Sequence, residues 1–229
     1  MSGNGRAIGD AVAARRRTNM IAGLRGMRRG PERSAGVKAG GNGPGRDEER
    51  CDLCGVGIPS EHEHLLHLGE RRILCACATC WAQRSGDPEL RPTGSRVVWL
   101  DDFELPGEVW ARLEVPIGLA FFMRSSSIGG MVAMYPSPAG ATESELKLDA
   151  WEDLRALNPE LDSLEPDAEA LVVNRISEPP AYVIAPIDEC YGLVGAVKVS
   201  WEGISGGDAI ERAVPTFFAR LRQRSREPR

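Results

Sequence analysis

Two Cys-x-x-Cys pairs constrain this chain more than any other feature. The pairs are Cys51/Cys54 and Cys77/Cys80, and the segment that they enclose holds five of the six cysteines and all three histidines of the protein. Each pair sets two thiols on one tight turn, and the spacing between the pairs allows a chain reversal to close four thiolates into a tetrahedron. Residues 51–86 are therefore predicted to form a Cys-rich metal-binding module.

The segment offers more ligands than one closed site needs, because Cys75 is a fifth thiol and a structural zinc ion takes four ligands. We predict that the four cysteines of the two pairs bind the metal and that Cys75 is a packed thiol. In the alternative ligand set, His64 or His62 replaces a cysteine, since imidazole also suits zinc. The candidate metal ligands are thus Cys51, Cys54, Cys77, Cys80, Cys75 and His64.

Zinc is the predicted metal, and iron is the alternative. A tetrathiolate iron site or an iron-sulfur cluster would use the same sulfurs as zinc. The two metals differ in an easily measured property, because a zinc site is colourless whereas an iron centre absorbs visible light.

Local signals within the module predict a miniature zinc ribbon. Gly55 follows the first Cys pair, where a left-handed backbone lets amide N–H groups point at the sulfurs. Residues His64–Leu68 and Arg71–Leu74 are expected to form two short strands turned at Gly69-Glu70. A helix is expected to begin at the second Cys pair and to include Ala78–Arg84.

The rest of the chain divides into a leader and one larger domain. Residues 1–50 are rich in Gly and Arg and lack aromatic residues, so they are predicted to be a disordered basic leader. Residues 86–92 are read as a Pro-rich connector, and residues 93–225 are long enough to bury one core. The clustered cysteines, the lack of a signal peptide and the lack of an apolar run near ~20 residues predict a cytoplasmic protein without a membrane span.

The formal net charge of −5 is unevenly distributed. Residues 1–45 carry nine Lys or Arg against two acidic residues, a net charge of +7, which leaves −12 for residues 46–229. A basic segment can bind nucleic acid, but this one has no aromatic side chain to stack on bases, and the body of the protein is acidic. Nucleic-acid binding is therefore not favoured.

The order of elements in residues 93–225 predicts an α+β domain with a four- or five-stranded, largely antiparallel sheet and helices on one face. Residues Tyr135–Ser144 are expected to be a long polar loop, of a kind that often carries binding function, although their Pro and Gly equally suit a sharp change of direction. Strands are expected at residues 96–103, 117–123, 131–135, 170–176 and 181–186, and helices at residues 106–113, 149–157, 188–201 and 208–221.

The sequence shows no catalytic constellation. Cys190 would need a histidine base to act as a nucleophile, and all three histidines lie in the metal module. The Ser/Gly-rich connection at residues 124–130 lacks the lysine and the following helix of a phosphate-binding loop. These observations favour a protein that is not an enzyme.

Six stretches of the chain form one set, namely Cys51–Cys54, His62–His64, Leu74–Cys80, Val115–Phe122, Tyr135–Ser144 and Ile187–Tyr191. Together they resemble an uncharacterised actinobacterial protein family encoded beside high-affinity nickel-iron hydrogenases. The likeness runs from about residue 51 to residue 225 and excludes the basic leader. It implies a setting, in hydrogenase assembly or its electron chain, with a hydrogenase subunit or maturation factor as partner.

The sequence therefore supports two functional hypotheses. The first is a non-catalytic accessory protein in which a structural zinc module is joined to a partner-binding α+β domain. The second is an iron-sulfur or rubredoxin-like electron-transfer protein, in which the fifth thiol or a nearby histidine completes or tunes the centre.

Overall fold

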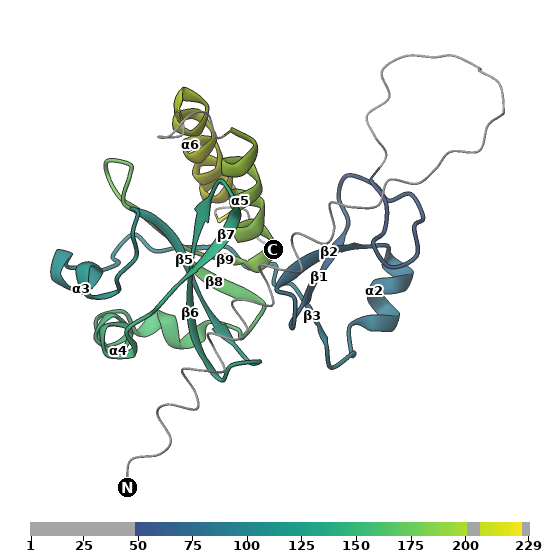
Figure 1. The fold of residues 1–229 in the computed structure, drawn as a ribbon, viewed down its shortest axis with the longest axis horizontal. Coiled ribbons are helices and arrows are strands. Elements are labelled where there is room, and N and C mark those ends of the chain that lie inside the picture. The colour runs from purple at the N-terminus through teal and green to yellow at the C-terminus, as the bar shows by residue number, and fades with distance from the viewer. Residues whose placement is uncertain (1–48, 201–206, 226–229) are drawn as a thin grey trace, which may run out of the picture. The chain divides into compact units, whose positions relative to one another are not determined.

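The computed structural model describes residues 49–200 and 207–225, so the predicted disordered leader lies almost entirely outside the described residues. Within the unit formed by residues 46–229, the chain builds two sheets. A three-stranded ribbon comes first and carries the cysteine pairs, and a six-stranded sheet flanked by helices follows (Figure 1).

The ribbon consists of β1 (Glu63–His67), β2 (Arg72–Ala76) and β3 (Leu90–Pro92), antiparallel in the order β2-β1-β3, followed after β2 by α2 (Ala78–Arg84). The predicted hairpin and helix are both present. The segment read as a connector contributes β3, which pairs with β1. Sequence patterns miss this strand because three residues are too few to show alternation.

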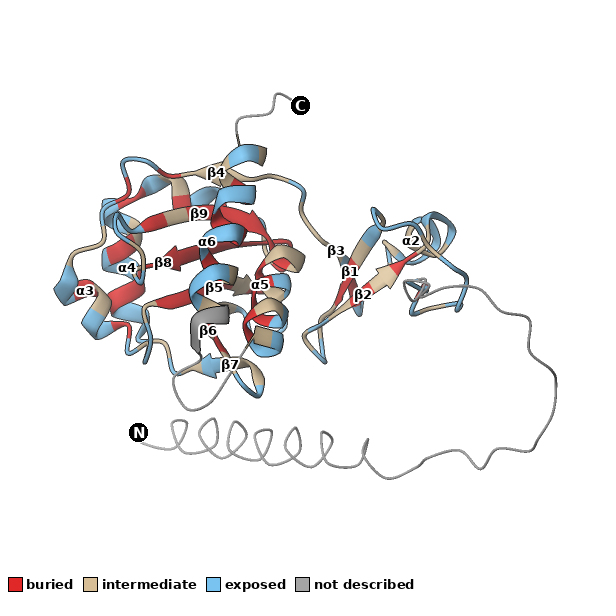
Figure 2. Cartoon of the chain, turned by 90° about the horizontal axis from the view of Figure 1, so that it is seen from above, coloured by how far each residue is buried: buried red, intermediate tan, exposed pale blue. Residues whose placement is uncertain are grey.

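The two faces of β1 have different neighbours. Leu65 lies in a small core inside the ribbon, which it shares with Leu74, Ala76 and Leu90. Leu66 points to the opposite face and belongs to the large core of the six-stranded sheet. Because side chains alternate along a strand, His64 shares the face of Leu66. Figure 2 shows the buried residues of both cores in red.

The larger sheet has the strand order β4-β9-β8-β5-β6-β7, and every neighbouring pair is antiparallel. Its central strands are apolar at nearly every position, as expected for strands that are covered on both faces. The strands are β4 (Val98–Trp99), β5 (Leu119–Ser125), β6 (Gly130–Ser137), β7 (Gly140–Ser144), β8 (Glu169–Asn174) and β9 (Ala181–Pro186).

Helices cover both faces of this sheet. Phe121 and the residues in phase with it pack against α5 (Ile187–Ser200) and α6 (Gly207–Arg224). Phe122 faces the other way, and its ring stacks on Trp151 with centroids 5.7 Å apart. The helices on that second face are α3 (Gly107–Arg112), α4 (Leu148–Leu157) and the 3-10 helix η1 (Pro159–Ser163).

The predicted fold class, an α+β domain with an antiparallel sheet behind a small ribbon-like module, is confirmed. Two details differ: the sheet has six strands rather than four or five, and the helices lie on both faces rather than one. The continuous apolar run in β5 requires this cover, because a strand with one solvated face would alternate with polar residues. None of the helices in the described residues is both long and apolar enough to span a membrane.

The prediction of a long polar loop at Tyr135–Ser144 is wrong, and the alternative, a sharp change of direction, is what the structure has. These residues form the end of β6, a tight turn and β7, with Tyr135 paired to Thr142 and Ser137 paired to Gly140. The two prolines suggested a loop, but Pro136 lies beyond the part of β6 that pairs with β5. Its missing N–H therefore removes no hydrogen bond from that ladder.

The segment between the ribbon and the larger sheet is held against β8. The Gly94 N–H donates to the Ala168 carbonyl oxygen over 3.0 Å, and a Cβ on Gly94 would lie 2.9 Å from Glu169 Cγ. Two residues later, the Arg96 guanidinium donates to both carboxylate oxygens of Glu169, over 2.9 and 2.6 Å. Glu169 is 5% exposed, so this ion pair is the main compensation for a buried charge.

Arg96→Ala is expected to reduce the free energy of unfolding by about 2–3 kcal/mol, because it leaves the Glu169 carboxylate buried without its cation. The Arg96 side chain is itself 37% exposed, so water replaces part of the lost interaction and the loss falls below that of a fully buried pair. Urea denaturation of the full chain measures the change. Arg91→Ala, at an exposed position of β3, is the matched control, and equal losses in the two variants would contradict this assignment.

Candidate metal centre

The first Cys pair lies on a tight turn that precedes β1. The Cys51 N–H donates to the Val56 carbonyl oxygen over 2.9 Å, and the Gly55 N–H donates to the Cys51 carbonyl oxygen over 2.8 Å. Gly55 has a φ of +77°, in the left-handed region that the sequence predicted for this position. The turn folds the chain back so that Cys51 and Cys54 lie close together.

The second Cys pair lies at the start of α2. Cys77 is the N-cap residue, and its sulfur accepts a hydrogen bond from the Cys80 N–H over 3.4 Å. The Cys77 carbonyl oxygen accepts from the Trp81 N–H over 2.9 Å and so begins the helix. A thiolate at this position receives N–H donors and the positive end of the helix dipole, both of which favour its negative charge.

The fold brings the four sulfurs together. The Sγ atoms of Cys51, Cys54, Cys77 and Cys80 all lie within 4.8 Å of one another, and those of Cys54 and Cys77 are 3.8 Å apart. A tetrahedral zinc tetrathiolate with Zn–S bonds of ~2.3 Å has sulfur–sulfur edges of about 3.8 Å. The group could therefore hold a metal ion, as the spacing of the two pairs predicts.

The acid–base properties of this group also favour a cation. Burial acts to raise the pKa of Cys51, but hydrogen bonds from the backbone of Cys77, Leu53 and Cys54 outweigh it and lower that pKa to about 6. Hydrogen bonds with the thiols of Cys54 and Cys77 raise the pKa of Cys80 to about 12. One thiolate thus forms readily, and a bound cation supplies the positive charge that lets the others lose their protons.

The residues that the sequence analysis treated as competitors for one site fall into two groups. Cys75 and His64 do not belong to the four-thiol group but lie with His62, and one ligand atom from each of these three lies within 4.8 Å of the others. Cys75 is held next to the first Cys pair through its backbone, since its N–H donates to Asp52 Oδ2 over 2.7 Å. Sequence reasoning missed the contribution of Asp188, which bonds to His64 over 2.8 Å.

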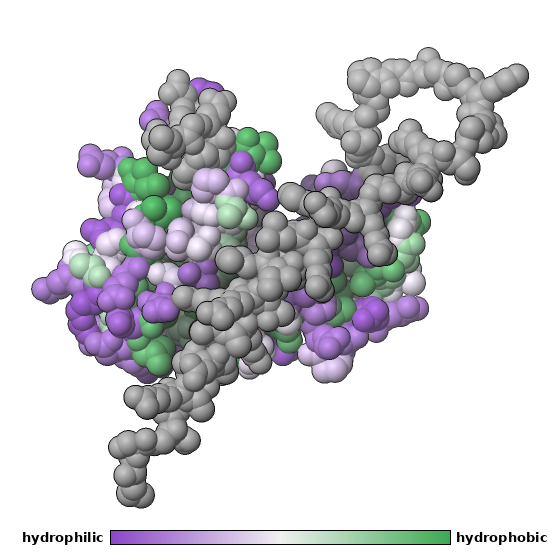
Figure 3. Space-filling view, in the orientation of Figure 1, coloured by the Kyte–Doolittle hydropathy of each residue, from purple (hydrophilic) through white to green (hydrophobic). Residues whose placement is uncertain are grey.

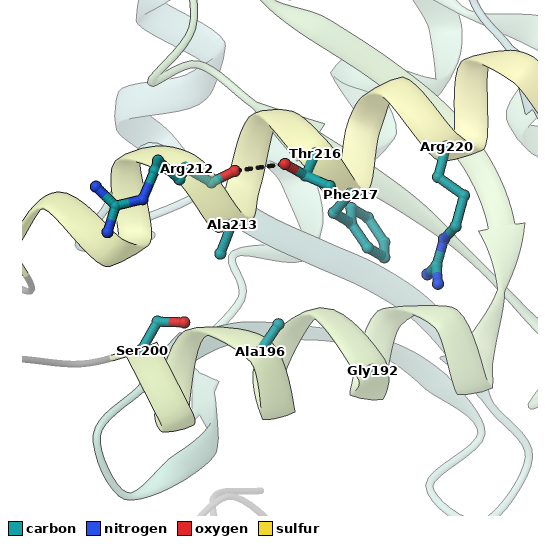
Figure 4. A pocket seen from close by; sticks show the side chains of 8 residues that line it. All are labelled: Gly192, Ala196, Ser200, Arg212, Ala213, Thr216, Phe217 and Arg220. Atoms are coloured by element: carbon teal, nitrogen blue, oxygen red, sulfur yellow. Dashed lines mark hydrogen bonds between the residues drawn. The ribbon is translucent and has the colours of Figure 1, made fainter.

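A separate groove of about 570 Å³ lies between α5 and α6 (Figure 4). On the α5 side it is lined by small residues, and on the α6 side Arg212 lies five residues before Phe217 and Arg220 three residues after it. The residues that line it include no thiol, imidazole or carboxylate. This lining does not suit a metal ion, and one of its two arginines, Arg220, already forms an ion pair with Glu189 of α5.

Comparison with known proteins finds one family. A family model described as "Family of unknown function (DUF5947)" matches residues 50–225, which covers both sheets and the four-thiol group. No curated protein matches the chain. No solved structure matches it either.

Gly55→Ala is expected to weaken metal binding by the four-thiol group about 5- to 30-fold. The substitution forces a side chain into a left-handed backbone at a cost of about 1–2 kcal/mol, and folding of the module is coupled to metal binding. Zinc affinity is measured by displacement of Co²⁺, followed through its thiolate charge-transfer absorption.

Gly86→Ala is the matched control, because a Cβ at either glycine meets no atom within 4 Å and only Gly55 has a positive φ. A similar loss of affinity in both variants would show that the left-handed turn does not matter.

Proposed function

We propose that this chain, which belongs to the family of unknown function (DUF5947), is a non-catalytic accessory protein with a structural zinc module and a partner-binding α+β domain. The observation that carries the proposal is the convergence of four cysteine sulfurs within 4.8 Å of one another at the end of the ribbon. Four thiolates complete the coordination of zinc and leave no position for a substrate, which is typical of a structural site.

The small size of the ribbon core supports a structural role for the metal. Four buried residues form this core, with Leu53 and Trp81 packed against it from the two Cys pairs. Such a core is too small to stabilise the turn and the start of α2 by burial alone, whereas a structural zinc ion contributes its binding energy directly to folding. Leu53 and Trp81 link the metal ligands to the core, so ion and core stabilise the same fold.

The partner-binding role rests on exposed surface rather than on a catalytic arrangement. Val56, two residues after the first Cys pair, is 51% exposed, and the α5–α6 groove is lined by Arg212 and by Arg220, which also pairs with Glu189. In the space-filling view, small groups of hydrophobic residues are exposed among hydrophilic ones (Figure 3). We propose a hydrogenase subunit or maturation factor as the partner, on the strength of the motif resemblance alone.

One observation favours an alternative, a rubredoxin-like iron site that transfers electrons. Cys54 is exposed, whereas Cys51 is buried, so one ligand of the four-thiol group reaches the protein surface. Electron transfer to a partner benefits from such a short path, and the reduction potential of an iron–thiolate centre depends on solvent exposure.

Protein purified without oxygen is expected to contain zinc and to show no visible absorption. A Cys54→Ser/Cys80→Ser variant is expected to contain one equivalent of zinc less than the wild type, because two of the four ligands are lost. Elemental analysis with a visible spectrum measures both properties.

Cys190→Ala is the matched control, since it removes a buried thiol outside the ribbon and is expected to leave the metal content unchanged. Iron with absorption that bleaches on reduction would support the electron-transfer alternative. Unchanged metal content in the double variant would overturn the ligand assignment.

A further inference from the structure

We propose that His62, His64 and Cys75 form a second metal site, distinct from the four-thiol group, that binds a borderline divalent cation such as Zn²⁺. Two imidazole nitrogens and one thiolate suit such an ion. Three protein ligands leave a coordination position open, in contrast to the closed four-thiol group.

The ribbon brings these three residues together through strand register. His64 in β1 lies directly opposite Cys75 in β2. His62 precedes His64 by two residues and shares its face, and the centroids of the two rings are 4.6 Å apart in an edge-on arrangement. One ligand atom from each residue lies within 4.8 Å of the other two, a spacing at which a single ion can contact all three.

The His62 ring has one nitrogen that lacks a partner. Its Nδ1 lies 2.9 Å from the Pro59 carbonyl oxygen, and because a carbonyl only accepts, Nδ1 carries the proton. The neutral ring then has its lone pair on Nε2, which is buried and has no hydrogen-bond partner among the described residues. The side chain is 6% exposed, so water does not readily replace that partner, and an ion at this nitrogen removes the unfavourable free energy of an unpaired buried acceptor.

The His64 ring is oriented in the way that metal-binding histidines are. Its Nδ1 lies 2.8 Å from Asp188 Oδ2, in the first turn of α5, which leaves Nε2 for the ion. A histidine held by a carboxylate on its far nitrogen is the usual arrangement in zinc proteins, because the carboxylate fixes the tautomer and makes the ring a stronger ligand. Asp188 Oδ1 is also buried without a partner in the described part of the chain, so acceptors outnumber donors here.

The site would join the ribbon to the larger domain. His64 lies in β1, His62 lies just before β1, and Cys75 lies in β2. The carboxylate that positions His64 comes from α5, which also packs on the six-stranded sheet. An ion bound here would therefore stabilise the contact between the two sheets. Its open position can accept water or a side chain of a partner, which the closed group cannot.

Cobalt titration of the full chain, stripped of metal and reduced under nitrogen, tests the proposal. The wild type is expected to bind two equivalents of Co²⁺ with different spectra. One equivalent has strong thiolate-to-cobalt absorption from four sulfurs, and the other has weak absorption from one sulfur. His62→Gln and Cys75→Ser are each expected to lose the second equivalent and to keep the first.

His67→Gln is the matched control, because His67 lies on the same strand, outside both groups, and accepts only from the Glu70 N–H among the contacts described for its ring. It is expected to keep both equivalents. Asp188→Asn, which changes no ligand, is expected to weaken the second equivalent about 10- to 100-fold while the four-sulfur absorption stays unchanged.

The proposal is overturned if the wild type binds a single equivalent, or if His62→Gln and Cys75→Ser both bind two. The second site and the proposed function are tested by different absorption signals. Loss of the four-sulfur absorption in Cys54→Ser/Cys80→Ser concerns the closed group, and the weak absorption of the second equivalent is expected to remain in that variant.

Discussion

The antiparallel pairing of β1 with β2 is the contact on which both ligand groups and the ribbon core depend. Its register places His64 opposite Cys75 and Leu65 opposite Leu74, so one face of the hairpin carries nitrogen and sulfur ligands while the other builds the small ribbon core. A shift of one residue would exchange these faces. The same pairing delivers Cys77, directly after β2, to the turn at Cys51.

The two ligand groups differ in what makes them unfavourable without a bound cation. In the four-thiol group the difficulty is charge, because thiolates that are 3.8 Å apart repel one another without a cation. In the group around His62 the difficulty is an unpaired acceptor, since a buried nitrogen lacks a donor. A divalent ion removes either difficulty, which is why both groups indicate metal binding even though their ligands differ.

The sequence predicted the elements that depend on local patterns of residues. It missed the contacts between residues that are far apart in the chain. The Cys spacing, Gly55 and the apolar runs of β5, β8 and β9 are each visible within a few residues, and the elements they predict are present. The partnership of His64 with Asp188 joins residues 124 positions apart, so no local pattern reveals it. The predicted hairpin, in contrast, already implied that Cys75 and His64 are neighbours. A turn at Gly69-Glu70 sets Cys75 directly opposite His64.

The ribbon places the two candidate ligand groups in different surroundings. The four-thiol group lies at the turn and the start of α2, beside a ribbon core of four buried residues. The His62 group faces α5, and the fold anchors that contact twice more, through Leu66 in the main core and through Arg71, which bonds Glu143 of β7 over 2.7 Å. The ribbon is thus joined to the larger domain by a hydrogen bond at His64, by the burial of Leu66 and by an ion pair at Arg71. In the second site that we propose, Asp188 would link the ion to α5, whose residues Gly192, Ala196 and Ser200 line one side of the groove opposite α6.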